Sequence, residues 1–277
     1  MIIDSHQHFW KYNTKNHAWI TDEMSVIKRD FMPDDLIPLL AANMIDGCVA
    51  VQADQTEDET HFLLNLAEEH KFIKGVVGWV DFRSEDIDAR LEYFSNFKKL
   101  KGFRHIVQAE PQEDFLLGKA FCNGIGSLKK YRFTYDLLVF PKQLPYVLSF
   151  VKLYPDQLFV VDHLAKPYIK SGKIDEWRKD IIALAQFSNV HCKLSGMVTE
   201  ANWSNWKTID FKPYVDVVLE SFGIDRVMFG SDWPVSLLAA SYDQCYELLH
   251  NLTHHLSSNE KDKLWGTNAT QFYNLLP

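Results

Sequence analysis

The sequence predicts a (β/α)8 (TIM) barrel, a closed ring of eight parallel strands with a helix following each strand. Eight short apolar runs recur along the chain, and their starts are separated by roughly 25 to 45 residues, the room that one strand-loop-helix unit needs. Runs such as GVVGWV at 75–80 and RVMFG at 226–230 show little alternation, which is typical of strands buried on both faces. Neither a GxGxxG nor a GxxxxGK[ST] pattern follows any run, which argues against an open nucleotide-binding sheet.

The boundaries of the elements follow from these runs and from the helical periodicity between them. Ser84 is expected to cap the helix at 84–97, and Pro213 to stand in the first turn of the helix at 213–222. Ser257 and Glu260 match a capping box that opens a last helix toward Trp265. Other helices are predicted at 57–70 and 174–187, and strands at 2–6, 47–52, 74–80, 101–107, 132–139, 158–163, 190–194 and 226–231.

Composition narrows the class of protein. The chain has 277 residues, 47% of them hydrophobic, and a formal charge of −8 from 37 acidic and 29 basic side chains. The acidic balance and the absence of a long basic run argue against a nucleic-acid or anionic-membrane partner. There is no run of 18 apolar residues, no signal-peptide pattern and no CxxC among the four cysteines. We expect a single cytoplasmic domain over residues 1–277.

Polar residues that can do chemistry follow most of the predicted strands. In a (β/α)8 barrel the carboxyl ends of all strands meet at one mouth, where active sites form. Each residue alone has an ordinary explanation: a strand histidine can be a satisfied core residue, an aspartate can cap a turn, and a lysine can extend along apolar surface. The residues in question are His6, His8, Arg104, His105, Tyr135, Asp136, Asp162, His163, Lys193 and Asp232.

Four of these residues form a more specific pattern. His6 and His8 are one residue apart, so both side chains point to the same side of a strand. The first, sixth and eighth strands lie near one another in a closed ring, so we expect His163 and Asp232 to meet these two histidines. Imidazole and carboxylate groups are suitable ligands for zinc, and three or four of them with an open position are typical of a catalytic site. The pattern predicts a metal site on His6, His8, His163 and Asp232.

At these residues the chain resembles the amidohydrolase superfamily, and within it the amidohydrolase-related branch that contains L-fuconolactonase-like and L-rhamnonolactonase-like sugar lactonases. The matching stretches include DSHQHFW, VQADQTEDET, GFRHIVQAEP, DHLAKP, CKLSGMVTEANW, RVMFGSDWPV and WGTNATQFY, which run from one end of the chain to the other. The resemblance implies a distorted barrel of the metallo-dependent-hydrolase type that hydrolyses a cyclic ester. Relatives with two metal ions have a bridging lysine or glutamate at the end of the fourth strand. GFRHIVQ, at that place in this sequence, has neither residue, which argues for one divalent metal at most, with a metal-free site as the alternative.

The resemblance and the chemistry together suggest roles for the residues. Asp232 is expected to be the general base, and His163 to complete the metal site or bind the carbonyl oxygen. The substrate is expected to be a small sugar lactone. Side chains expected to contact it are Trp10, Trp19, Gln52, Arg104, His105, Tyr135 and Lys193.

Two questions stay open at this point. A metal-dependent decarboxylase or hydratase acting on an aromatic or muconate-type acid shares the His-x-His and the final aspartate, so it is the alternative function. The tryptophan-rich loops could contact sugar rings, or they could form the interface of a homodimer.

Overall fold

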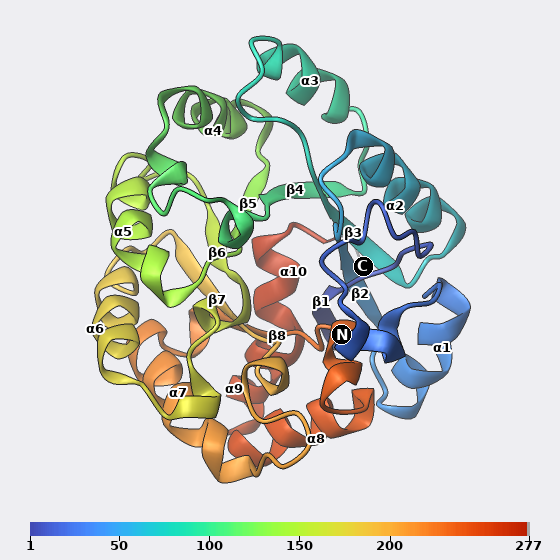
Figure 1. Cartoon of the computed structure of the whole chain (residues 1–277), viewed down its shortest axis with the longest axis vertical. Helices are drawn as coiled ribbons and strands as arrows, with labels where there is room; N and C mark the ends of the chain where they lie inside the picture. Colours follow the sequence, from blue (N-terminus) through green and yellow to red (C-terminus); the bar gives the residue numbers. More distant parts are fainter. Residues whose placement is uncertain (276–277) are drawn as a thin grey trace.

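The computed structural model describes residues 1–275, and in them a single sheet of eight parallel strands runs in the order β1 to β8. Each strand pairs with the next one in the sequence, and β1 lies beside β8 to complete the ring (Figure 1). The strands are β1 (Ile3–Gln7), β2 (Gly47–Val51), β3 (Ile73–Gly78), β4 (Leu100–His105), β5 (Thr134–Leu137), β6 (Phe159–Val161), β7 (Val190–Leu194) and β8 (Val227–Phe229). The predicted (β/α)8 barrel and all eight of its strands are confirmed.

Helices α1 to α8 form a layer outside the ring and cover the outer face of the strands (Figure 1). The predicted helices at 57–70 and 174–187 are confirmed as α2 and α6. The helices are α1 (Pro33–Ala42), α2 (Glu57–Glu69), α3 (Ile87–Phe94), α4 (Lys119–Tyr131), α5 (Leu144–Lys152), α6 (Asp175–Leu184), α7 (Thr208–Phe222), α8 (Tyr242–Leu252), α9 (Ser258–Asp262) and α10 (Asn268–Phe272). None of the helices within residues 1–275 is long and apolar enough to cross a membrane.

Two of the predicted helix starts are wrong, and local hydrogen bonds explain both. The Ser84 hydroxyl accepts from the Asp86 amide in a turn, and α3 begins only at Ile87. The Asp210 carboxylate accepts from the Lys207 amide, which starts α7 five residues before Pro213 and leaves that proline inside the helix. The capping box of Ser257 and Glu260 is confirmed at the start of α9.

The C-terminal helix α10 closes one end of the barrel. It lies in the middle of the ring in Figure 1, and its Ala269 and Phe272, together with Tyr273 just after it, pack against interior residues of the strands such as Ile3 and Met228. The Asn268 side-chain amide donates to the carbonyls of Ile224, which precedes β8, and Val227, its first residue. This end is therefore a packed core, and the opposite end, where the strands finish, is left for chemistry.

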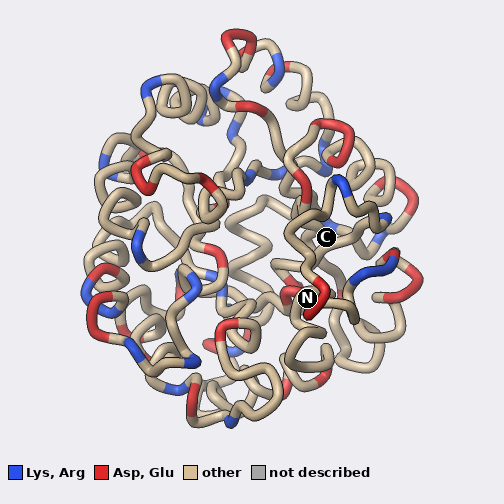
Figure 2. The backbone as a smooth tube through the Cα atoms, in the orientation of Figure 1, with Lys and Arg blue, Asp and Glu red and all other residues tan. Residues whose placement is uncertain are grey.

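Charged side chains are distributed in two very different environments. Lysine and arginine are interspersed with aspartate and glutamate over the outer helices and loops (Figure 2). A smaller set is buried within the barrel or at its mouth, where taking a charge out of water is costly unless it is paired. Its members are Asp4, Arg104, Asp136, Asp162, Lys193 and Asp232.

One partly buried carboxyl, that of Glu59, holds the loop that joins β2 to α2. The two oxygens of Glu59 accept from the backbone amides of Ala53 (2.9 Å) and Asp54 (2.5 Å), and the Glu59 amide in turn donates to the Thr56 hydroxyl. Burial raises the pKa of Glu59 to about 8. This loop carries side chains toward the mouth, so Glu59 helps to position them.

The raised pKa of Glu59 predicts a pH-dependent stability. The unfolded chain releases this proton near pH 4.5, whereas the folded protein retains it until about pH 8. Between these values the folded state binds more protons, so the free energy of unfolding falls as the pH rises. We expect Glu59→Gln to reduce this slope when urea unfolding is measured at pH 5, 6.5 and 8. Parallel curves for the variant and the wild type would contradict the assignment.

Candidate active site

The site forms where the last strand meets the first. Between β8 and β1 the backbone makes two hydrogen bonds, from the Asp232 amide to the His6 carbonyl (2.8 Å) and from the His8 amide to the Trp233 carbonyl (2.7 Å). Asp232 has a φ of +57°, a left-handed conformation that an aspartate adopts more readily than most residues. This backbone geometry turns the Asp232 carboxylate toward both histidines.

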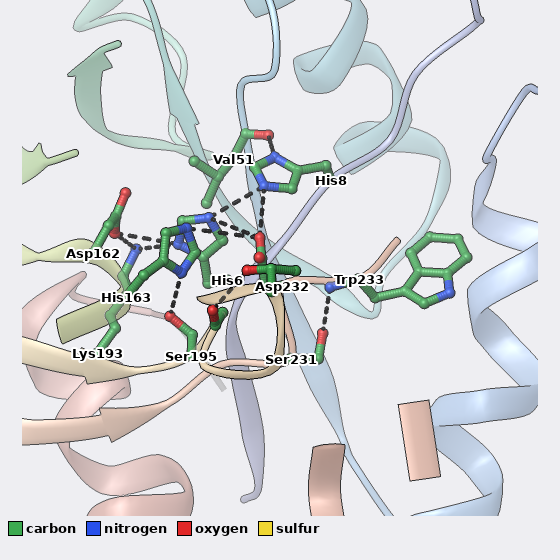
Figure 3. Close-up of polar contacts among 12 residues, drawn as sticks. His6, His8, Val51, Asp162, His163, Lys193, Ser195, Ser231, Asp232 and Trp233 are labelled. Carbon is green, nitrogen blue, oxygen red and sulfur yellow. Dashed lines mark hydrogen bonds and ion pairs between the residues drawn. The ribbon is translucent and has the colours of Figure 1, made fainter. Parts of the chain in front are cut away.

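Three imidazoles converge on this carboxylate (Figure 3). The Nε2 atoms of His8, His163 and His6 lie 3.3, 3.7 and 3.9 Å from Asp232 Oδ1. The Nε2 atoms of His6 and His8 are 3.2 Å apart. All four side chains are buried, so their mutual interactions are only weakly screened by solvent.

The opposite nitrogen of each ring has its own partner, which fixes the ring's orientation. His8 Nδ1 is 2.7 Å from the Val51 carbonyl oxygen and donates to it. His163 Nδ1 lies 2.9 Å from the Ser195 hydroxyl. His6 Nδ1 faces two charged groups, Lys193 Nζ at 3.1 Å and Asp162 Oδ1 at 3.2 Å.

A left-handed turn brings His163 into the mouth. Adjacent residues of a strand point to opposite faces, so Asp162 and His163 could not both face the interior in an extended chain. Residues 163–166 instead have φ values of 54°, 54°, 58° and 52°. The Trp177 indole donates to the Leu164 carbonyl (2.7 Å) and holds the turn. Gly196 packs against the imidazole so closely that a Cβ there would lie 2.4 Å from His163 Nδ1.

The electrostatics set the protonation states. Burial lowers the pKa of His6 well below its ordinary value and that of His163 to about 4. Burial alone would raise the pKa of Asp232, but its contacts with His163, His8 and His6 outweigh this effect and lower it. At neutral pH the site therefore holds a carboxylate beside neutral His6 and His163, an arrangement that can accept a proton.

The donor atoms fit a single divalent cation. Zinc binds nitrogen and oxygen ligands at about 2.0 to 2.2 Å, so tetrahedral ligands lie about 3.3 to 3.6 Å from one another. The separations of 3.2 to 3.9 Å among the His6, His8 and Asp232 donor atoms lie close to this range, and these three residues form one group that could hold a metal. His163 Nε2 lies 3.7 Å from the same Asp232 oxygen. His6, Asp162 and His163 form a second, overlapping group that could hold a metal. Arg104 Nη1 also lies 3.2 Å from His6 Nε2, so a fixed cation already borders the cluster.

A cavity of about 220 Å³ opens above the cluster. Its floor is polar and consists of His8, Arg104, His163 and Asp232. One wall is apolar, and the rim carries an indole, two amides and an ammonium group. The wall residues are Ala53, Ile106, Ala109, Leu138 and Val235, and the rim residues are Trp19, Gln55, Gln108 and Lys166.

Of the seven side chains predicted to contact a substrate, Trp19 and Arg104 line this cavity. Gln52 and Lys193 do not line it but lie buried inside the barrel. The Gln52 side chain accepts from Arg104 at 2.8 Å, and Lys193 pairs with Asp136 at 2.5 Å. Both therefore support groups at the mouth rather than face a ligand.

The other three predicted contacts are directed elsewhere. Trp10 is buried, and its indole donates to the Arg29 carbonyl. His105 follows the inward-facing Arg104, and Tyr135 precedes the inward-facing Asp136. Because side chains alternate along a strand, His105 and Tyr135 point outward toward the helices. His105 stacks on Phe115, and Tyr135 lies among core aromatic side chains. The expectation that these three side chains touch a ligand disagrees with this geometry.

Several residues that line the cavity or contact the histidines were not predicted from the sequence. Ser195 directly follows a predicted strand, so the rule that polar strand ends gather at the mouth could have found it. Lys166 lies three residues after His163 in DHLAKP, but only the left-handed turn brings it to the rim. Gln108 has a buried Oε1 atom without a hydrogen-bond partner among residues 1–275. No sequence signal distinguishes that glutamine from a surface residue.

The Ser195 contact yields a prediction about activity. Ser195→Ala removes the group that fixes the His163 ring, and we expect kcat/KM to fall about tenfold, in line with the loss of outer-shell partners of site histidines. Ser236→Ala is the control, because the Ser236 hydroxyl is also buried but lacks a hydrogen-bond partner in the described chain. Equal effects of the two substitutions would argue against a role for Ser195.

Comparison with known proteins agrees with this geometry. The family model described as amidohydrolase matches residues 3–275. A Burkholderia multivorans protein named L-fucono-1,5-lactonase is 40% identical over 99% of this chain and 96% of its own length. A solved amidohydrolase from Burkholderia multivorans with bound zinc covers all of both chains with a TM-score of 0.96 and 40% identity.

More distant structures share only the fold. A 5-carboxyvanillate decarboxylase from Novosphingobium aromaticivorans, complexed with manganese, has a TM-score of 0.70 at 13% identity and covers 99% of this chain and 96% of its own. The full-length family match, the 40% identity and the histidine-aspartate mouth of the barrel lead to one conclusion. This chain belongs to the amidohydrolase family.

Proposed function

We propose that the protein hydrolyses a sugar-derived lactone of the L-fucono- or L-rhamnono-lactone type to the open-chain aldonic acid. The observation that carries the proposal is the buried Asp232 carboxylate among three imidazoles at the floor of a small cavity. The relative named L-fucono-1,5-lactonase supports this choice of substrate class.

The proposed reaction begins with a water molecule held by Asp232. Its carboxylate takes a proton as the water oxygen attacks the lactone carbonyl carbon, and the carbonyl oxygen becomes negatively charged. When His163 does not ligate a metal, it is suited to donate a hydrogen bond to that oxygen, and such a donor contributes about 3 kcal/mol. The bond from the carbonyl carbon to the ring oxygen then breaks, and protonated Asp232 returns its proton to the departing alkoxide.

We further propose zinc as the metal that His6, His8, His163 and Asp232 hold. A bound divalent metal would supply Lewis acidity toward the carbonyl and toward water. The zinc-containing structure of the Burkholderia multivorans amidohydrolase supports this choice. Without the metal, Asp232 would still be the base, and the histidine N–H groups would have to stabilise the developing charge.

The cavity suggests how a sugar lactone would be oriented. Arg104 and Lys166 are cationic donors for hydroxyl or carbonyl oxygens, and Trp19, which is 38% exposed, offers a flat surface to a sugar ring. The apolar wall of Ile106 and Leu138 suits a carbon-rich edge such as the methyl end of a deoxy sugar. The alternative decarboxylase or hydratase is supported only by structural neighbours that share the fold.

The central test is a substrate screen with Asp232→Asn. Asparagine tolerates the left-handed backbone at this position, so the variant should fold. We expect wild-type protein to release acid from L-fucono- or L-rhamnono-lactones, and the variant to lose about 10²- to 10⁴-fold in kcat, the usual contribution of a general base. A wild-type protein that opens no aldonolactone, with or without added zinc, would refute the proposed function.

Lys166 provides a test of substrate binding. Its ammonium group lies at the rim, 3.1 Å from Glu200, and its side chain is largely buried. Lys166→Met should raise KM about tenfold with a much smaller change in kcat, because a charged hydrogen bond to the substrate is lost. Lys166→Arg keeps the charge and should recover part of the affinity. An unchanged KM in Lys166→Met would rule out contact with the substrate.

A further inference from the structure

Lys193 is buried inside the barrel, directly below the histidine cluster, and three acceptors surround its ammonium group. Asp136 Oδ2 lies at 2.5 Å, Asp162 Oδ1 at 3.0 Å and His6 Nδ1 at 3.1 Å from Nζ. A lysine ammonium has three N–H groups and cannot accept, so a contact with a ring nitrogen is a donation from lysine to the ring. His6 Nδ1 therefore carries no proton while this hydrogen bond exists.

Asp162 competes with Lys193 for the same ring nitrogen. Its Oδ1 atom lies 3.2 Å from His6 Nδ1, but this oxygen has no well-oriented hydrogen bond within residues 1–275. A hydrogen bond from His6 to Asp162 would need a proton on Nδ1. While Lys193 donates to that nitrogen, the proton is absent. The other oxygen of Asp162 is held by Arg104 at 3.0 Å.

The position of the proton on His6 decides what the ring offers to the mouth. A neutral imidazole with an unprotonated Nδ1 has its proton on Nε2, so it presents a donor to the cluster. A neutral His8, which donates from Nδ1 to the Val51 carbonyl, can accept a hydrogen bond from that N–H across the 3.2 Å between the Nε2 atoms. Arg104 Nη1 also lies 3.2 Å from His6 Nε2 and can only donate, so Arg104 favours the opposite tautomer, with an unprotonated Nε2. A metal ligand, in contrast, must present an unprotonated nitrogen.

We propose that Lys193 is a positioning residue that opposes metal binding by favouring the His6 tautomer protonated on Nε2, whereas Asp162 and Arg104 favour the tautomer with the unprotonated Nε2 that a metal needs. For metal to bind, the His6 proton must move from Nε2 to Nδ1, where it is donated to Asp162, and Lys193 loses an acceptor. The balance between Lys193 and these two residues sets how strongly this chain holds zinc. The inference rests on the proposed metal site and not on lactone hydrolysis.

The test is zinc affinity in the charge-balanced variant Asp136→Asn with Lys193→Met, measured by competition with a chromophoric chelator. Removing one positive and one negative charge together leaves the net charge of the interior unchanged. The carboxylate of Asp162 is then free to accept a hydrogen bond from His6 Nδ1–H. We therefore expect the zinc Kd to fall about tenfold, the size of effect that residues hydrogen-bonded to metal-binding histidines usually have.

Tyr273→Phe is the matched control. The Tyr273 hydroxyl donates to Asp136 Oδ2 at 2.7 Å, so this substitution alters the same buried network without touching the contact between Lys193 and His6. Its zinc Kd should stay within about twofold of the wild-type value, well below the effect expected for an outer-shell partner of a metal-binding histidine. A folded double variant with unchanged or weaker zinc affinity would overturn the proposal, as would an equal gain in Tyr273→Phe.

A direct measurement covers the case in which the double variant does not fold. Nitrogen-15 NMR of labelled histidine in the metal-free wild-type protein distinguishes protonated from unprotonated ring nitrogens. We expect His6 to show an unprotonated Nδ1 and a protonated Nε2, and the opposite assignment would overturn the proposal. Neither experiment involves turnover, so a protein that binds zinc as expected but opens no lactone would refute the proposed function alone.

Discussion

The structure depends on how the ring of strands closes between β8 and β1. The other neighbouring strands are joined by parallel ladders along their length, whereas here the backbone of Asp232 and Trp233 bonds to His6 and His8 just beyond the end of β8. The hydrogen bonds that close the barrel therefore also fix the separation between the carboxylate and the imidazoles. A change that loosens this closure would disturb the candidate site directly, because the same residues carry both.

A second constraint is the cost of burying charge inside the barrel. Asp136, Asp162, Lys193 and Arg104 point into a space that α10 closes from one end, and each is paired with an opposite charge. Removing one partner from such a network would leave an uncompensated buried charge, which is strongly destabilising. The network lies directly beneath His6, so the pairing that the fold requires also sets the hydrogen bonds of a ring at the mouth.

Backbone strain is concentrated at the same end of the barrel. The left-handed residues include Asp232 and the whole turn from His163 to Lys166. Such conformations cost roughly 1 to 2 kcal/mol per residue and persist only where the surroundings enforce them. Here the enforcing contacts are the Trp177 indole on the Leu164 carbonyl and the close approach of Gly196 to His163. The strain places two consecutive side chains, Asp162 and His163, within one cluster.

The sequence by itself determined the barrel, because the spacing of apolar runs reflects the length of a strand-loop-helix unit and their uniform apolar character reflects burial on both faces. It also indicated that His6, His8, His163 and Asp232 meet, since polar residues at strand ends share one mouth. Only the tertiary structure decided which of the other polar residues near the strand ends face that mouth. Arg104 faces inward and His105 outward because side chains alternate along a strand, and the sequence does not fix the phase of that alternation. Lys166 reaches the rim through a left-handed turn that long-range packing enforces, and no local pattern in the sequence encodes that packing.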